Sequence, residues 1–208
     1  MDKGAYLEKY NYIKKRKLFS FLIILFCISI LIGILYFFLG SKSNKNMTLD
    51  YYTDFFSAIK NSKVNYLECI INSFSSNVLE NIVLFLLSIS IIGVFFVFLM
   101  FVFHSFTLGY VISSFLYFYK LKGIFAVIIY IIPLIIRIFL LFILTFYSFN
   151  FANRFYSFLV KKKDIDIKSY FRRYCKVFLF VLILFVFNSL VESVVVPFLL
   201  KSFTKSII

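Results

Sequence analysis

Long apolar runs separated by short polar segments dominate this chain. The longest run without Lys, Arg, Asp or Glu extends from Asn81 to Tyr119. A helix that crosses a bilayer uses roughly 20 apolar residues, so this run is about twice as long as one crossing requires. We therefore predict that it crosses the membrane twice, as helices over residues 79–101 and 104–119, with a turn near His104 and Ser105.

The same pattern predicts three further membrane helices, over residues 18–40, 124–150 and 177–200. The first is longer than the apolar core of about 7–15 residues that a cleaved secretory signal carries, so we expect it to remain in the protein. A minimal loop at Lys120, Leu121 and Lys122 separates the third helix from the fourth. The expected fold is an all-α integral membrane protein, a single membrane domain over residues 1–208 with five transmembrane helices.

Residues 41–77 form the longest polar stretch, yet apolar side chains recur in it at helical spacing. We predict two short amphipathic helices that lie on the membrane surface. Such helices either cap the bundle or dock a protein partner. The candidate docking surface comprises Tyr52, Phe55, Phe56, Ile59, Leu67, Ile70 and Phe74.

Charge then orients these elements. The chain has 23 Lys and Arg against 9 Asp and Glu, a net charge of +14, and the basic residues cluster in residues 1–17 and 153–176. Basic segments concentrate on the cytoplasmic side of membrane proteins. We expect both clusters there, facing the anionic inner leaflet rather than nucleic acid. This topology puts residues 41–77 and the C-terminus on the outer side of the membrane.

Two ionisable residues interrupt the predicted fourth and fifth helices, Arg137 and Glu192. Ionisable groups inside a membrane are costly and frequently functional. The helices are antiparallel in the predicted topology, and the lean of the two side chains along their helices shortens the offset between them. The two residues either form a buried pair that fixes helix register or lie on a transport path.

Proline and glycine mark further positions in the apolar helices. Pro133 cannot donate a hydrogen bond to the carbonyl of Ile129, so we expect a helix kink there and at Pro197. Gly33, Gly93 and Gly109 occur singly in apolar helices, where close helix packing is the usual reason.

Catalytic chemistry finds little support in the sequence. His104 is the single histidine, and no nucleophile-elbow, zinc-protease, Cys-x-x-Cys or phosphate-loop motif occurs. Asp50 and Asp54 share one helix face, but we interpret them as exposed surface carboxylates rather than as a catalytic pair. We expect no enzyme activity, no catalytic residue, no metal and no cofactor.

Three short motifs in the C-terminal two thirds carry a resemblance to a known family. They are Ser88-Ile89-Ser90-Ile91-Ile92-Gly93 followed by Gly109, Gly123 followed by Ile132-Pro133, and the ending from Glu192 to Pro197-Phe-Leu-Leu-Lys. In their order and spacing the chain resembles the stage II sporulation protein M family.

The resemblance implies a non-enzymatic scaffold. In that family the protein lies in the mother-cell membrane at the sporulation septum. There it recruits the peptidoglycan hydrolases known as sporulation proteins D and P, which thin septal wall and drive engulfment of the forespore. The alternative is a small transporter or permease subunit that uses Arg137 and Glu192 on a substrate path.

Overall fold

The computed structural model describes residues 3–61, 65–160 and 166–207, which form helices with no strand among them. Five helical stretches are long and apolar enough to cross a membrane, so the chain is an all-α, multi-pass membrane protein. The elements in chain order are α1 (Lys3–Leu39), α2 (Lys42–Asn61), α3 (Tyr66–Ser88), α4 (Gly93–Leu159), α5 (Ile167–Leu190), the π-helical turn η1 (Val191–Val195) and α6 (Val196–Ile207).

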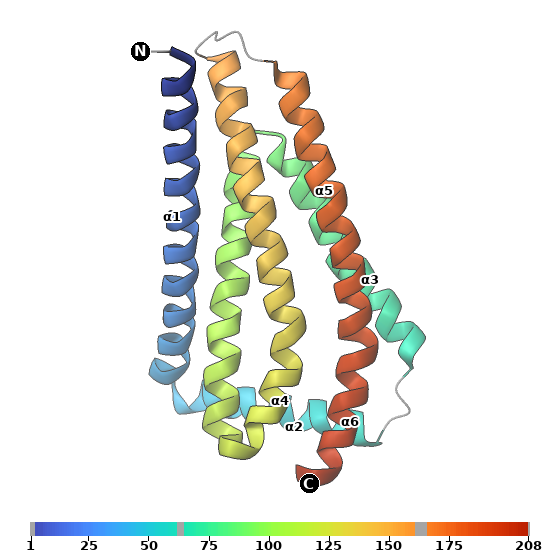
Figure 1. Ribbon diagram of the computed structural model, residues 1–208. Helices are drawn as coiled ribbons and strands as arrows, with labels where there is room; N and C mark the ends of the chain where they lie inside the picture. The colour runs from blue at the N-terminus through green and yellow to red at the C-terminus, as the bar shows by residue number, and fades with distance from the viewer. Residues whose placement is uncertain (1–2, 62–64, 161–165, 208) are drawn as a thin grey trace.

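The long helices stand side by side along one axis, while α2 runs crosswise beneath them at the end where the chain terminates (Figure 1). The two termini lie at opposite ends of the bundle, as an odd number of crossings requires. Helix α2 contacts α4 and α6. The first amphipathic segment after α1 is therefore a helix packed across one end of the bundle.

Helix α4 contains two crossings joined by a sharp reversal at Lys120. Its backbone angles are φ 49° and ψ −136°, and the two crossings are Gly93–Lys120 and Val127–Leu159. The reversal falls where the loop between the third and fourth helices is predicted. Pro133, where a kink is predicted, also lies within α4. The residue of that helix with non-helical backbone angles is Lys120, not Pro133 or a neighbour of it.

The predicted turn near His104 is wrong. The chain reverses between Ser88 and Gly93 instead, and His104 is a buried residue inside α4. The second crossing therefore begins at Tyr66 rather than at residue 79. The segment expected to lie on the surface up to residue 77 in fact supplies the first half of a membrane helix.

The polar residues of α3 explain this difference. Asn77, Asn81 and Ser88 are buried between helices rather than turned to water. Asn81 donates a hydrogen bond to the carbonyl of Asn77 at 2.7 Å, and Ser88 bonds to the hydroxyl of Tyr174 on α5. Polar side chains that bond across helices are tolerated inside a membrane bundle, so polarity here does not mark a surface.

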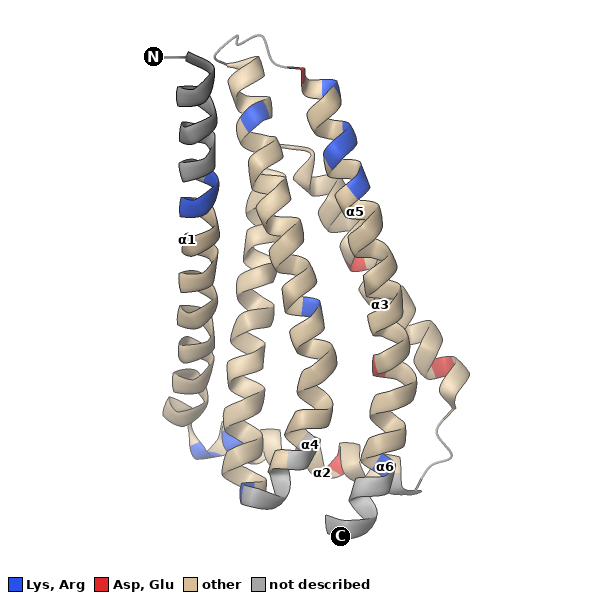
Figure 2. Ribbon diagram, viewed as in Figure 1, with Lys and Arg blue, Asp and Glu red and all other residues tan. Residues whose placement is uncertain are grey.

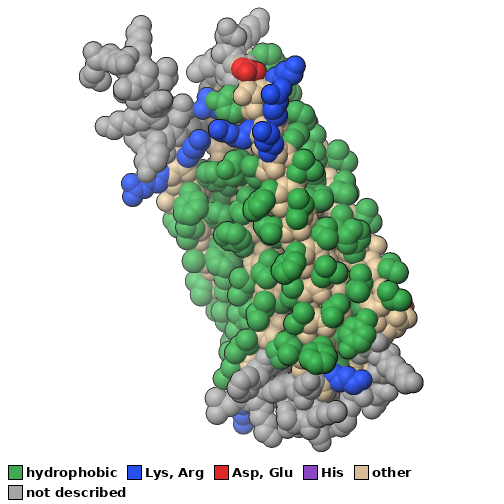
Figure 3. Space-filling view, turned by 45° about the vertical axis from the view of Figure 1, so that its right-hand side comes forward, with side chains coloured by type: hydrophobic (Ala, Val, Ile, Leu, Met, Phe, Trp, Pro, Cys, Tyr) green, Lys and Arg blue, Asp and Glu red, His purple; other side chains and the backbone are tan. Residues whose placement is uncertain are grey.

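Charged side chains gather at the two ends of the molecule. Arg154, Lys168, Arg172 and Arg173 lie at the end of the bundle where the chain begins, together with Lys15–Lys17 of α1 (Figure 2). Lys161, Lys162 and Lys163 of the predicted basic segment lie outside the described residues. Between the ends, Figure 3 shows a broad band of apolar side chains, which matches a surface that faces lipid.

Candidate functional site: a polar cluster inside the bundle

Arg137 and Glu192 meet inside the bundle. The Nη2 atom of Arg137 on α4 lies 3.1 Å from Oε2 of Glu192 on η1, and both side chains are partly buried. A single unpaired charge at this depth would be expensive, whereas a hydrogen-bonded pair offsets much of that cost. The contact joins two helices that are far apart in sequence.

Glu192 also accepts hydrogen bonds from α3. Its Oε2 atom lies 2.9 Å from Nδ2 of Asn77 and 3.3 Å from Oγ of Ser73. The same amide nitrogen of Asn77 lies 3.1 Å from Oγ of Ser189 on α5. Three donors from two helices therefore converge on one carboxylate oxygen within the apolar bundle, and hydrogen bonds of this kind to a charged group are stronger than those between neutral groups.

The helix that carries Glu192 changes its winding at this point. Residues 191–195 form a π-helical turn in which the N–H of Val196 donates to the carbonyl of Val191. Pro197 follows directly and has no N–H to donate to the carbonyl of Ser193. A wider turn before a proline redirects the side chains it contains, and such turns are frequent at functional sites. The predicted irregularity at Pro197 thus lies next to Glu192.

Asn188 links the same region to the proline of α4. Its side-chain amide donates to the carbonyl of Pro133 at 3.2 Å, and the residue is fully buried. The amide oxygens of Asn77, Asn81 and Asn188 are buried without a hydrogen-bond partner in the described structure. Buried polar atoms of this kind carry a free-energy cost that an apolar residue would avoid. These three positions therefore favour binding or specific helix pairing over maximal stability.

A second ionisable pair, which the sequence did not reveal, lies beside the first. Nε2 of His104 on α4 is 2.9 Å from Oε1 of Glu80 on α3. The signal in the sequence is the single histidine in the uncharged run together with the glutamate directly before that run. The error in the turn position separated the two residues, because it put His104 at a membrane surface.

A pocket of about 220 Å³ is lined by both residues of the first pair and by His104 of the second. Its walls include His104 and Thr107 from the first crossing of α4, Tyr130 and Arg137 from the second, and Glu192 from η1. Phe103, Pro133, Leu134 and Val196 complete the lining. The candidate functional site is therefore an intramembrane polar pocket, hereafter the polar pocket, with both acceptors and donors at its wall.

Two of the three singled-out glycines pack helix against helix. A methyl group on Gly33 of α1 would clash with the carbonyl of Phe106 and lie 3.0 Å from the backbone nitrogen of Tyr110. A methyl group on Gly109 of α4 would clash in turn with the carbonyl of Ile30. The backbones of α1 and α4 therefore touch at this crossing, as small residues at membrane helix interfaces allow.

Gly93 has a different role from the one predicted. A methyl group there would clash with the carbonyl of Leu87, across the turn between α3 and α4. Ser90 supports the same turn, because its hydroxyl accepts the backbone N–H of Gly93 at 2.8 Å. Gly93 thus permits a tight reversal rather than a contact between separate helices.

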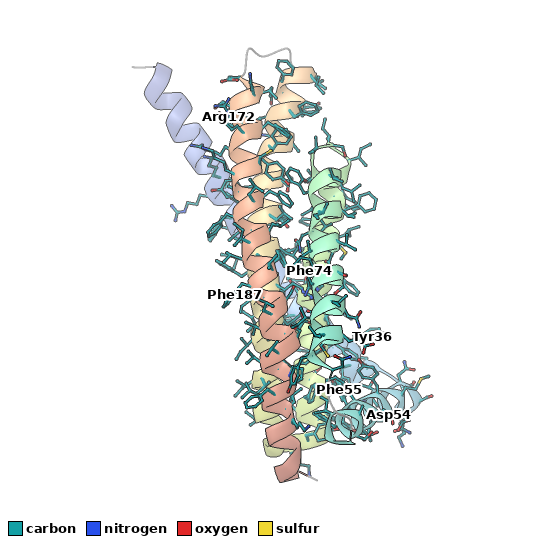
Figure 4. All side chains as sticks on the ribbon, turned by 90° about the vertical axis from the view of Figure 1, so that its right-hand side faces the viewer. Tyr36, Asp54, Phe55, Phe74, Arg172 and Phe187 are labelled. Carbon is teal, nitrogen blue, oxygen red and sulfur yellow. The ribbon has the colours of Figure 1, made fainter. Side chains whose placement is uncertain are left out.

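The predicted docking surface divides into two parts. Tyr52, Phe56 and Ile59 are buried, and they pack against apolar residues of α4 and α6. That part caps the bundle and offers no surface to a partner. Phe55 and Ile70 are half-buried, whereas Leu67 and Phe74 are exposed on α3. Figure 4 labels Phe74 on α3 and Phe55 on α2.

Two hydrogen bonds between hydroxyl groups connect α2 to α4. The Tyr52 hydroxyl lies 2.7 Å from Oγ of Ser114, and Oγ1 of Thr48 lies 2.7 Å from the hydroxyl of Tyr110. Burial raises the pKa of Tyr52 above its ordinary value, so this hydroxyl stays protonated and its hydrogen bond persists at any physiological pH. Helix α2 is held in place by both apolar packing and side-chain hydrogen bonds.

Comparison with known proteins gives one family. A family model described as Stage II sporulation protein M matches residues 22–197, which include three of the five crossings in full, most of the first and fifth, and both ionisable pairs. Neither curated proteins nor solved structures give a significant match. Because the family match covers most of the chain, this chain belongs to the stage II sporulation protein M family of sporulation-related membrane proteins.

Proposed function

We propose that this protein is a non-enzymatic membrane scaffold that recruits peptidoglycan hydrolases of the sporulation D and P type to the sporulation septum. The family match over residues 22–197 carries the proposal. Such a scaffold would act in the mother-cell membrane, where wall thinning precedes engulfment of the forespore. Its N-terminus and the basic end of the bundle would lie in the cytoplasm, against anionic lipid.

The fold supports this role through the end of the molecule opposite the start of the chain. Helix α2 lies across that end, and Asp50 and Asp54 are exposed on it one helical turn apart. Figure 4 shows Asp54 at the outer side of α2. In the proposed topology this acidic face points toward the cell wall, where secreted hydrolases act.

A second candidate function has one observation in its favour. His104, Arg137 and Glu192 line a common pocket within the bundle, an arrangement that transporters use on a substrate or proton path. This candidate requires the charges themselves to act. A scaffold requires only that the helices keep their places.

Charge reversal on α2 tests the recruiting surface. We expect Asp50→Lys with Asp54→Lys to reduce capture of hydrolases from sporulating cells at least severalfold, while the variant remains folded, because both side chains are exposed. The matched control is Lys168→Glu with Arg172→Glu, two exposed positions at the opposite end of the bundle. Equal loss in both variants, or no loss in the first, would remove α2 as the recruiting surface.

A further inference from the structure

A second pocket lies between α2 and the two crossings of α4, and aromatic rings dominate its walls. It has a volume of about 370 Å³. Its rings belong to Tyr51, Tyr52 and Phe55 of α2 and to Tyr110, Phe115 and Tyr130 of α4. Met47, Thr48 and Val111 complete the lining, which contains no Lys or Arg among the described residues. We refer to it as the aromatic pocket.

The rings of the aromatic pocket stand at different angles to one another. Tyr52 stacks on Phe115 with ring centres 4.3 Å apart. Tyr51 is tilted by 59° from Tyr52, and Tyr130 is tilted by 37° from Phe115. Hydrogen bonds between the hydroxyls of Tyr52 and Tyr110 and the neighbouring side chains of Ser114 and Thr48 hold two of these rings in place. The pocket is therefore a fixed arrangement of aromatic faces and edges.

Such an arrangement favours an organic cation. The face of an aromatic ring carries negative potential, and rings grouped around a cavity bind ammonium groups through it. Phenol hydroxyls add oxygen acceptors, and no cationic side chain of the described lining competes. The same helix already shows this chemistry. Nζ of Lys45 on α2 lies 5.7 Å from the ring centre of Phe37 and 5.6 Å from that of Tyr117.

The level of the pocket along the bundle indicates which ammonium group can reach it. Tyr110 and Phe115 belong to the last turns of the crossing Gly93–Lys120, and Tyr130 belongs to the first turn of the crossing Val127–Leu159. Helix α2 lies across this end of the bundle. The pocket is therefore at the boundary between the apolar band and the membrane surface, where phospholipid headgroups are concentrated.

We propose that the aromatic pocket binds the ammonium headgroup of a membrane phospholipid. The headgroup enters between α2 and α4, with the ammonium against the rings and the acyl chains along the apolar outer face of the bundle. This inference does not depend on hydrolase recruitment. It assigns to α2 a role in lipid selection, since three of the six rings belong to this helix.

The test compares lipids that differ in the headgroup alone. Purified full-length protein is exchanged into mixed micelles that contain dioleoyl phosphatidylethanolamine and dioleoyl phosphatidylglycerol in equal amounts, and native mass spectrometry counts the lipids that remain bound. Because the anionic glycerol lipid also binds the basic end of the bundle, the readout is the ratio of retained ethanolamine lipid to retained glycerol lipid, compared between wild type and a variant that lacks one ring of the pocket. We expect this ratio to be at least about twofold higher in wild type. An equal ratio in the two proteins would mean that the pocket takes acyl chains without regard to the headgroup, and would overturn the proposal.

Substitutions then locate the preference. Tyr51 is 67% exposed, so Tyr51→Leu removes a ring with little risk to folding, and we expect it to lower the preference by about twofold to fivefold. Tyr51→Phe keeps the ring and should keep the preference. Tyr66→Leu is the control, because Tyr66 is a partly exposed ring outside the pocket. If Tyr51→Leu leaves the preference intact, or Tyr66→Leu removes it equally, the aromatic pocket is not its source.

Discussion

At the scale of single residues, the carboxylate of Glu192 connects three helices. It accepts from Arg137 on α4 and from Ser73 and Asn77 on α3, while its own residue lies in the π turn that follows α5. Each of these contacts lies within a membrane-crossing stretch. Removal of either charge would leave its partner partly buried without an opposite charge, although Glu192 would keep its hydrogen bonds from Ser73 and Asn77.

A double-mutant cycle measures this coupling. We expect Arg137→Leu and Glu192→Leu each to destabilise the protein, by about 1–3 kcal/mol, because each leaves one partly buried charge without its partner. The double variant should recover most of that loss, since an apolar pair replaces the ion pair. The measurement is the melting temperature of the detergent-solubilised protein.

Arg172→Leu provides the control for the cycle, because this exposed arginine lies at the basic end of the bundle (Figure 4). It should change the melting temperature little. Losses of the two single variants that simply add in the double variant would mean that Arg137 and Glu192 do not stabilise each other.

At the scale of elements, the crossing of α1 and α4 depends on glycine. The main chains approach so closely that Gly33 and Gly109 each lie against a carbonyl group of the other helix. Helix α1 makes most of its contacts with α4, so this crossing positions the first membrane helix. In a membrane, van der Waals packing between close backbones is a main source of helix association.

Added methyl groups should separate these helices. We expect Gly33→Ala to lower the melting temperature by at least several degrees, because the new methyl group would clash with the backbone of α4 rather than with a movable side chain. Ile32→Ala on the same helix is the control, since Ile32 is largely exposed on the lipid-facing side. The close approach would be refuted by a Gly33→Ala protein as stable as the control.

The elements also show where sequence reasoning succeeds. Charges and turn residues mark the C-terminal end of α1 and the reversal at Lys120, and the predicted pairing partners Arg137 and Glu192 lie in contact. The start of α1 at Lys3 is not predicted, because the basic residues before Leu18 are expected to lie outside the helix.

The start of α3 could not be found in this way. Ser73 and Asn77 are polar, but they donate hydrogen bonds to Glu192 inside the bundle. A hydropathy pattern cannot distinguish such residues from surface residues.

The turn between α3 and α4 was missed for a related reason. It consists of Ile89, Ser90, Ile91 and Ile92. Because none of these residues is charged, no charged residue marks the turn within the long apolar run. The burial of half of the predicted docking surface is equally invisible in the sequence. Helical periodicity identifies the apolar face of α2, but not whether lipid, a partner or the rest of the chain covers it.

At the scale of the whole molecule, two ends that carry charged residues enclose an apolar band (Figures 2 and 3). The basic end holds the beginning of the chain and the turn between α3 and α4, whereas α2 and the end of α6 lie at the other. Positive-inside orientation would place the first end in the cytoplasm. Each surface then faces a different compartment.

Cysteine labelling tests this orientation and the corrected turn together. In a chain whose Cys27, Cys69 and Cys175 are replaced by Ser, we expect Ser90→Cys to react with a membrane-impermeant maleimide only after the cells are opened. Asp50→Cys should react in intact cells with a permeabilised wall. His104→Cys should react slowly in both states, because this position is buried in the bundle. Labelling of Ser90→Cys from outside would reverse the topology.

The central claim is that the molecule recruits cell-wall hydrolases as a scaffold and does not move a substrate through its polar pocket. The most direct measurement is the amount of hydrolase captured from sporulating cells by the Arg137→Leu/Glu192→Leu double variant, relative to wild type at equal folded protein. The account predicts capture close to the wild-type amount, because the helices stay in place without the charges. Capture at background by wild type, or its loss in a folded double variant, would contradict it.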